Sequence, residues 1–116
     1  MEKTRILIVE DDLDFCQLIS QVIGREKDME VVGICQTGQE ALNEARDKEP
    51  DMVLMDLNLT GKELDGINAA RRIRLETRAK VIILTAYDAP DTVIEASTGA
   101  LASGYVLKDQ FFMLVP

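Results

Sequence analysis

Side chains that could hold a metal ion and accept a phosphoryl group follow directly after short apolar runs of the chain. Glu10 and Asp11 come after "ILIV", and Asp56 closes "MVLMD". Thr85 closes "VIILT", and Lys108 closes "GYVLK". If these runs are parallel strands of one sheet, their carboxyl ends share one edge, which is where such sheets bind ligands. Three carboxylates, a hydroxyl and an ammonium group should therefore meet in one small patch.

The charges in that patch restrict its chemistry. Carboxylates held a few ångströms apart repel one another unless a proton or a cation lies among them. With oxygen ligands alone, Mg²⁺ is the expected cation. Mg²⁺, the Lys108 ammonium and the Thr85 hydroxyl could together neutralise the oxygens of a phosphoryl group. Asp56 is then placed as a nucleophile that forms an acyl phosphate.

Each of these residues, taken alone, also has a purely structural explanation. An acidic residue after a strand is more often a helix cap than a ligand, and this explanation suits Asp12 and Asp14. A lone lysine at a strand end is usually solvated, and threonine is a common strand residue. The functional interpretation is favoured because such groups occur together at the ends of different strands.

The apolar runs that must position these groups are interpreted as strands. They do not alternate apolar with polar residues, so we expect strands that are buried on both faces of a parallel sheet. The five runs cover residues 5–9, 30–35, 52–55, 80–86 and 104–108. The connecting segments must then supply helices to both faces, which predicts a three-layer α/β fold around a doubly wound, five-stranded parallel sheet.

The segments between the runs do have the spacing of amphipathic helices. Gly24 and Pro50 are expected to end the first two, and Thr37 with Glu40 has the spacing of a capping box. Asp88 is expected to cap the fourth. The predicted inner faces carry Phe15, Leu18, Ile19, Val22 and Ile23, then Ala41, Leu42 and Ala45, then Ile67, Ala70 and Ile73, and finally Val93, Ile94 and Ser97.

The end of the chain departs from this alternation. Only eight residues follow Lys108, and most of them are apolar. We therefore expect a fifth helix that is short or truncated. Residues 1–116 are expected to form a single domain excised from a longer protein.

Composition excludes several classes of function. The formal net charge of −8 opposes direct binding to nucleic acid. The chain has no histidine, which rules out imidazole-based triads and a phosphohistidine of its own. No apolar run is long enough to cross a bilayer, so we expect a cytoplasmic domain that does not enter the membrane. Cys16 and Cys35 match no metal-binding spacing and are expected to be small buried side chains.

With its motifs in this order, the sequence resembles the receiver domain of two-component response regulators. The resemblance runs from "ILIVEDD" through "DMVLMDLNL", "LDGINAARRIR" and "VIILTAYD" to "GYVLKD", which is nearly the whole chain. It implies a flavodoxin-like sheet with the strand order 2-1-3-4-5, in which the first and third strands are neighbours.

The resemblance also implies how the metal end of the site works. Asp56 is implied as the phosphoacceptor and Asp11 as a direct ligand of Mg²⁺. Glu10 is implied to act mainly through a bound water, and Asn58 to offer its backbone carbonyl to the metal. Asp12 has no ligand role in this pattern and keeps its role at the helix start.

The remaining implied roles concern the switch and its partners. Lys108 is implied to contact the phosphoryl group, Thr85 to turn its hydroxyl toward it, and Tyr105 to fill the space that Thr85 leaves. The implied donor is a phosphohistidine of a sensor histidine kinase or phosphotransfer protein. The domain is implied to catalyse only its own phosphorylation and dephosphorylation. An effector domain in the full-length chain and a homodimer through the fourth helix and fifth strand are further expectations.

Departures from the receiver pattern leave an alternative open. The turn "DLNLTGKELDG" lacks a proline and is two residues longer than expected, and Asp109 stands where many relatives have proline. The alternative is a degenerate receiver that acts as an interaction module without phosphorylation. A Mg²⁺-dependent phosphatase is disfavoured because Asn58 stands where such enzymes need a second acid. A flavin- or nucleotide-binding protein is disfavoured because no Gly-rich loop follows the first strand.

Overall fold

The computed structural model describes residues 2–56, 66–85 and 104–107, the last of these through the backbone alone. Five strands form one parallel sheet in the order β2-β1-β3-β4-β5, and the predicted order of the first four is confirmed. The strands are β1 (Thr4–Val9), β2 (Met29–Cys35), β3 (Met52–Asp56), β4 (Lys80–Thr85) and β5 (Gly104–Leu107). The predicted fourth and fifth helices fall outside the described residues.

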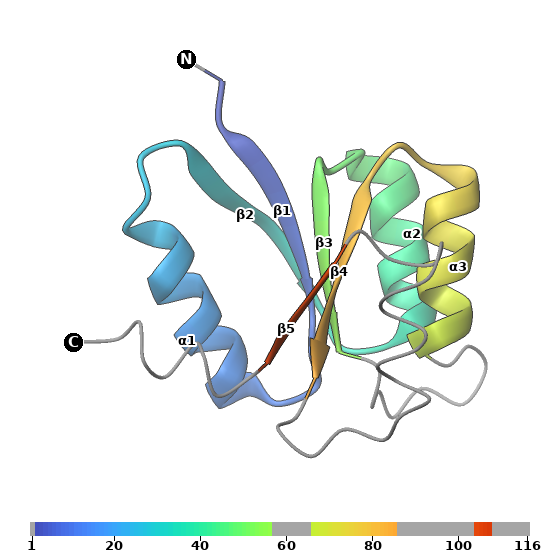
Figure 1. Ribbon diagram of the computed structural model, residues 1–116, viewed down its shortest axis with the longest axis horizontal. Helices are drawn as coiled ribbons and strands as arrows, with labels where there is room; N and C mark the ends of the chain where they lie inside the picture. Colours follow the sequence, from blue (N-terminus) through green and yellow to red (C-terminus); the bar gives the residue numbers. More distant parts are fainter. Residues whose placement is uncertain (1, 57–65, 86–103, 108–116) are drawn as a thin grey trace.

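Three described helices cover the two faces of this sheet. They are α1 (Leu13–Gly24), α2 (Gly38–Lys48) and α3 (Gly66–Glu76). Figure 1 shows α1 on one face, and α2 and α3 side by side on the other. The described part of the chain therefore has the three layers that the strand pattern predicts. Among the described residues, no helix is both long enough and apolar enough to cross a membrane.

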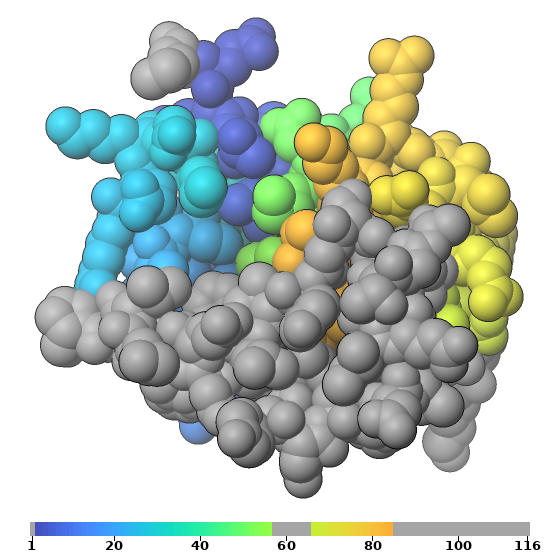
Figure 2. All heavy atoms as spheres, viewed as in Figure 1, coloured from blue at the N-terminus to red at the C-terminus, as the bar shows by residue number. Residues whose placement is uncertain are grey.

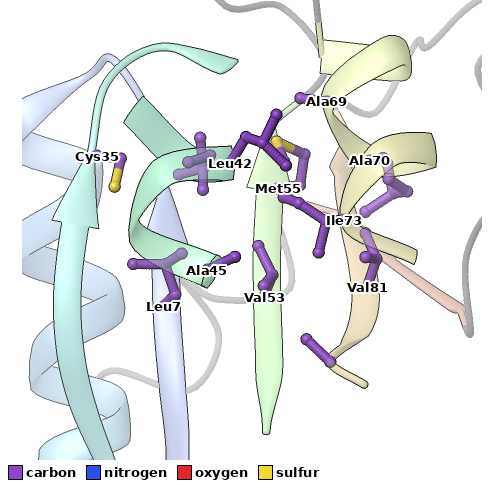
Figure 3. Packing of buried hydrophobic residues seen from close by; sticks show 14 residues of the cluster. Leu7, Cys35, Leu42, Ala45, Val53, Met55, Ala69, Ala70, Ile73 and Val81 are labelled. Carbon is purple, nitrogen blue, oxygen red and sulfur yellow. The ribbon is translucent and has the colours of Figure 1, made fainter. Parts of the chain in front are cut away.

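The uninterrupted apolar runs are explained by burial on both faces. Along β1, Ile6 and Ile8 belong to the core beneath α1, and Leu7 and Val9 belong to the core beneath α2 and α3. Successive strand side chains point to opposite faces, so a strand covered on both sides needs apolar residues at every position. Figure 3 shows the second core, with Leu42 of α2 and Ile73 of α3 over the sheet.

The strands of the parallel sheet start at one edge and end at the opposite edge. In the space-filling view of Figure 2, the described atoms in the upper part include the starts of β1, β2, β3 and β4 and the end of α3. Figure 1 shows that the same strands end at the lower edge. Glu10 and Asp11 follow the end of β1, and Asp56 ends β3, so these residues lie at the edge opposite the one displayed at the top of Figure 2.

A bulge in β2 shifts the register of this strand before its carboxyl end. Ile6 pairs with Val31, but Leu7 pairs with Gly33, so Val32 is an extra residue in β2. The Lys48 ammonium donates a hydrogen bond to the Val32 carbonyl oxygen at 2.9 Å. A Cβ atom at Gly33 would lie only 3.0 Å from the Lys48 nitrogen, so glycine makes room for this contact. Lys48 thus supports the shifted register on which the end of β2 depends.

The helix starts agree with the caps expected from the sequence. The Thr37 hydroxyl accepts a hydrogen bond from the Glu40 backbone N–H at 3.1 Å. The Glu40 carboxylate in turn accepts from the Gln36 backbone N–H at 3.3 Å, one residue earlier than in a standard capping box. At the other end, α2 stops because Glu49 takes a left-handed conformation with φ of 47°, immediately before Pro50.

Removing the Thr37 cap is expected to destabilise the fold measurably. Thr37→Ala leaves the Glu40 N–H without its side-chain acceptor and should lower the free energy of unfolding by about 1 kcal/mol. Urea denaturation followed by circular dichroism measures this change. Thr37→Ser is the matched control, since it keeps the hydroxyl, and equal losses in both variants would show that packing of the threonine methyl group matters instead.

Candidate functional site

Strand register brings Glu10 and Asp56 side by side. β1 pairs with β3 as far as Val9 with Met55, and the next residue of each segment is Glu10 and Asp56. Side chains two residues apart point to the same face of a strand. Ile8 and Leu54 lie in the core beneath α1, so Glu10 and Asp56 extend that same face beyond the apolar packing.

The structure joins Asp11 to this pair. One carboxylate oxygen from each of Glu10, Asp11 and Asp56 lies within 4.8 Å of the other two. Glu10 is completely buried, Asp56 is 2% exposed, and Asp11 is partly exposed. The three carboxylates that were expected to converge therefore do so. Their cluster is buried on the protein side and reaches solvent at Asp11.

These three groups suit a hard divalent cation. All the side-chain ligands are carboxylate oxygens, with neither sulfur nor imidazole among them, and such a set is typical of Mg²⁺ or Ca²⁺ sites. Mutual repulsion of three carboxylates in a poorly solvated place is relieved by a positive ion. Three protein ligands also leave room for the waters that Mg²⁺ retains. The residues present therefore fit the expected metal.

Hydrogen bonds hold the segment that carries Glu10 and Asp11. The Glu10 backbone N–H donates to the Cys35 carbonyl oxygen at 2.9 Å, which extends the pairing of β1 with β2. On the other side, one Asp12 carboxylate oxygen accepts from the backbone N–H groups of Asp14 and Phe15 at 3.0 and 3.3 Å. Glu10 and Asp11 thus lie between the end of a sheet ladder and a capped helix start.

Asp12 caps α1 and is not part of the carboxylate cluster. Its side chain points to the first turn of the helix, where it satisfies N–H groups that have no partner within the helix. The cluster consists of Glu10, Asp11 and Asp56 alone among the residues that the structure describes. This separation of adjacent acids matches the expectation that Asp12 serves the helix start.

The other predicted site residues are described only in part. Asp56 pairs with Leu84, so Thr85 follows at the same edge as the last residue of β4. Thr85 pairs with Leu107, and Tyr105 lies within β5 opposite Ile83. For Thr85 and Tyr105 the backbone alone is described, and Asn58 and Lys108 lie outside the described residues, so the roles of all four stay predictions.

Both cysteines are buried, as expected, and neither is in a disulfide. Burial, followed by the negative charges of Glu44 and Glu40, raises the pKa of the Cys35 thiol to about 12. Cys35 is therefore protonated at neutral pH and packs as a small apolar side chain. The Cys16 thiol also donates a hydrogen bond to the Glu10 backbone carbonyl, and nothing in the sequence around Cys16 predicts this contact.

Comparison with known proteins identifies the family of this chain. Residues 6–112 match the family described as the response regulator receiver domain. The chain is 36% identical over 104 residues to the transcriptional regulatory protein DesR of Bacillus subtilis, covering 90% of this chain and 50% of DesR. It is 35% identical over 100 residues to a protein-glutamate methylesterase/protein-glutamine glutaminase of Syntrophus aciditrophicus, covering 86% of this chain and 28% of that protein.

A solved structure shows the same likeness in three dimensions. The signal receiver domain of the putative response regulator NarL from Mycobacterium tuberculosis superposes with a TM-score of 0.83 at 29% identity, covering 99% of this chain and 92% of that one. The chain spans half or less of the length of the two curated relatives, whose names describe different outputs. The family match covers most of the chain, and the chain belongs to the response regulator receiver domain family.

Proposed function

We propose that this domain is a phosphorylation-controlled switch, which accepts a phosphoryl group on Asp56 in a Mg²⁺-dependent reaction. The observation that carries the proposal is the convergence of Glu10, Asp11 and Asp56, whose carboxylate oxygens lie within 4.8 Å of one another at the ends of β1 and β3. One of the three can act as nucleophile, and together they can hold the cation. Membership of the receiver family supports the same assignment.

Asp56 is the favoured nucleophile of the three. One Asp56 carboxylate oxygen would attack the phosphorus atom of a phosphohistidine, forming an O–P bond as the N–P bond breaks. The bonding electron pair leaves with the imidazole nitrogen, which takes up a proton. Asp11 and Asp56 would hold Mg²⁺, with Glu10 acting mainly through a bound water, and the ion would neutralise charge on the phosphoryl oxygens.

The remaining predicted site residues complete the proposal. Asn58 would offer its backbone carbonyl to the metal, and Lys108 would contact the phosphoryl group. Thr85 would turn toward that group and Tyr105 would turn inward behind it. The support for these roles is the receiver family pattern together with the positions of Thr85 and Tyr105 in β4 and β5. The added charge would favour one of two nearly equal conformations.

The proposed partners follow from the same reaction. The donor would be a sensor histidine kinase or a phosphotransfer protein, as the receiver family pattern implies, and the lack of histidine in this chain is consistent with a separate donor. The domain would act on no separate substrate and would catalyse only its own phosphorylation and dephosphorylation. An output domain in a longer protein, and homodimerisation through the fourth helix and fifth strand, belong to the proposal as well.

A small phosphodonor tests the proposal without knowledge of the kinase. The purified domain is incubated with acetyl phosphate with and without Mg²⁺, and its intact mass is recorded over time. We expect one phosphoryl group to be added only in the presence of Mg²⁺, since the carboxylate cluster repels the donor until a cation is bound.

The absence of an adduct could result from fast hydrolysis or from a domain that is not phosphorylated. Binding of beryllofluoride distinguishes these two cases. Fast hydrolysis of the acyl phosphate would hide the adduct, but beryllofluoride with Mg²⁺ would still bind as a stable phosphoryl mimic. Protection against thermal unfolding measures this binding. If neither reagent has an effect, the domain is a degenerate receiver that acts as an interaction module, which is the alternative suggested by the unusual turn after Asn58.

A further inference from the structure

The thiol of Cys16 contacts the backbone of a proposed metal ligand. Cys16 is 2% exposed, and its sulfur atom donates a hydrogen bond to the Glu10 carbonyl oxygen at 3.3 Å. The backbone N–H of the same cysteine donates to the Asp12 carbonyl oxygen at 3.0 Å. One residue in the first turn of α1 therefore contacts the segment that carries Glu10 and Asp11 at two backbone positions.

The Glu10 carbonyl is a sensitive point in this segment. It belongs to the peptide group that joins Glu10 to Asp11, the two consecutive members of the carboxylate cluster. That peptide group is planar, so a change in its orientation alters ψ of Glu10 and φ of Asp11 together. Both carboxylates would be displaced relative to Asp56 on β3. A hydrogen bond that holds this peptide group thus acts on two ligands at once.

The N–H side of Glu10 is held by a different element. It donates to the Cys35 carbonyl oxygen at the end of β2 at 2.9 Å. The two cysteines therefore contact the same residue in different ways. Cys16 uses its side chain, whereas Cys35 uses its backbone, which every substitution at position 35 retains. This difference provides a matched pair of buried cysteines for experiment.

We propose that Cys16 is a positioning residue for the metal site, acting through the Glu10–Asp11 peptide group. This inference rests on the proposed function, because it concerns the affinity of the cluster for Mg²⁺. The competing explanation is that Cys16 only fills space in the core beneath α1, together with Phe15 and Ile19. The two explanations differ in what the loss of the thiol does to metal binding.

The test measures Mg²⁺ affinity, not phosphorylation. Isothermal titration calorimetry at constant ionic strength gives the Kd of the unphosphorylated domain. We expect Cys16→Ala to raise this Kd by about 3- to 10-fold, the effect of one lost hydrogen bond to the ligand framework. Cys16→Ser keeps a donor and should restore the Kd to within about twofold of wild type. If Cys16→Ala does not unfold cooperatively, Cys16→Val, which fills the space without a donor, replaces it.

Cys35→Ala is the control for a loosened core. It removes an equally buried thiol but keeps the Cys35 carbonyl, so we expect lower stability with an unchanged Kd for Mg²⁺. The inference is overturned if Cys16→Ala binds Mg²⁺ as wild type does, if Cys16→Ser binds as weakly as Cys16→Ala, or if Cys35→Ala weakens binding equally. Failure of wild type itself to bind Mg²⁺ would instead count against the proposed function.

Discussion

Asp56→Asn is expected to abolish the phosphoryl adduct formed with acetyl phosphate and Mg²⁺. The side-chain amide has nearly the shape of the carboxylate but lacks the anionic oxygen that attacks phosphorus. We expect the rate of adduct formation to fall by more than about 10³-fold, as is usual when a covalent nucleophile is removed. Intact-mass measurements on wild type and variant, under identical conditions, provide the comparison.

The fold of this variant should survive, so that the loss can be assigned to chemistry. Asp56 is 2% exposed at the end of β3, and asparagine occupies the same space. It also removes one of three charges that repel one another across at most 4.8 Å. The temperature of unfolding without Mg²⁺ is therefore expected not to fall.

Asp12→Asn provides the matched control for the loss of one acid near the site. Asp12 is outside the cluster, and asparagine caps a helix as well as aspartate does. This variant should form the adduct at nearly the wild-type rate. An adduct that still forms in Asp56→Asn would show that another residue is the phosphoacceptor. Peptide mapping would then identify that residue.

Much of the fold could be predicted because its strands are buried on both faces. Ile6, Leu7, Ile8 and Val9 show no periodicity, and the structure divides them alternately between the two cores. The convergence of Glu10, Asp11 and Asp56 could be predicted for a related reason. Parallel strands of similar length end at one edge, so residues at the ends of different runs must meet there.

The contacts of Lys48 with Val32 and of Cys16 with Glu10 could not be predicted in the same way. Nothing in the run "EVVGIC" indicates that Val32 is an extra residue, and the Lys48 ammonium that contacts the bulge is 16 positions later in the sequence. The contact of Cys16 with Glu10 depends on the rotation of α1 against β1. An amphipathic pattern shows which face of a helix is buried, but not which backbone atom a given side chain on that face reaches.

Asp11→Asn is expected to weaken Mg²⁺ binding by about 10- to 100-fold or more, because changes even outside the ligand set of a metal site often cost that much. Asp11 is the partly exposed member of the cluster, so it is the carboxylate that an entering hydrated ion meets first. An asparagine amide offers only a neutral oxygen, so the carboxylates around the cation carry one negative charge less. Calorimetric titration with MgCl₂ measures the Kd.

The free energy of unfolding provides an independent measurement of the affinity for Mg²⁺. A ligand that binds only the folded state stabilises it by about 2.7 kcal/mol at a concentration 100 times its Kd. The gain in unfolding free energy on adding Mg²⁺ should therefore be smaller in Asp11→Asn than in wild type. Without Mg²⁺ the variant should be at least as stable as wild type, because one repulsive charge is gone.

Asp12→Asn decides whether Asp11 acts as a ligand or only as a nearby negative charge. The two substitutions remove the same charge from adjacent residues, but Asp11 lies in the cluster, whereas the Asp12 carboxylate accepts hydrogen bonds from the start of α1. Direct ligation predicts a large increase in the Kd for Asp11→Asn and little change for Asp12→Asn. Equal increases would mean that Mg²⁺ is attracted by the total negative charge of residues 10–14. Asp11 would then not be a direct ligand.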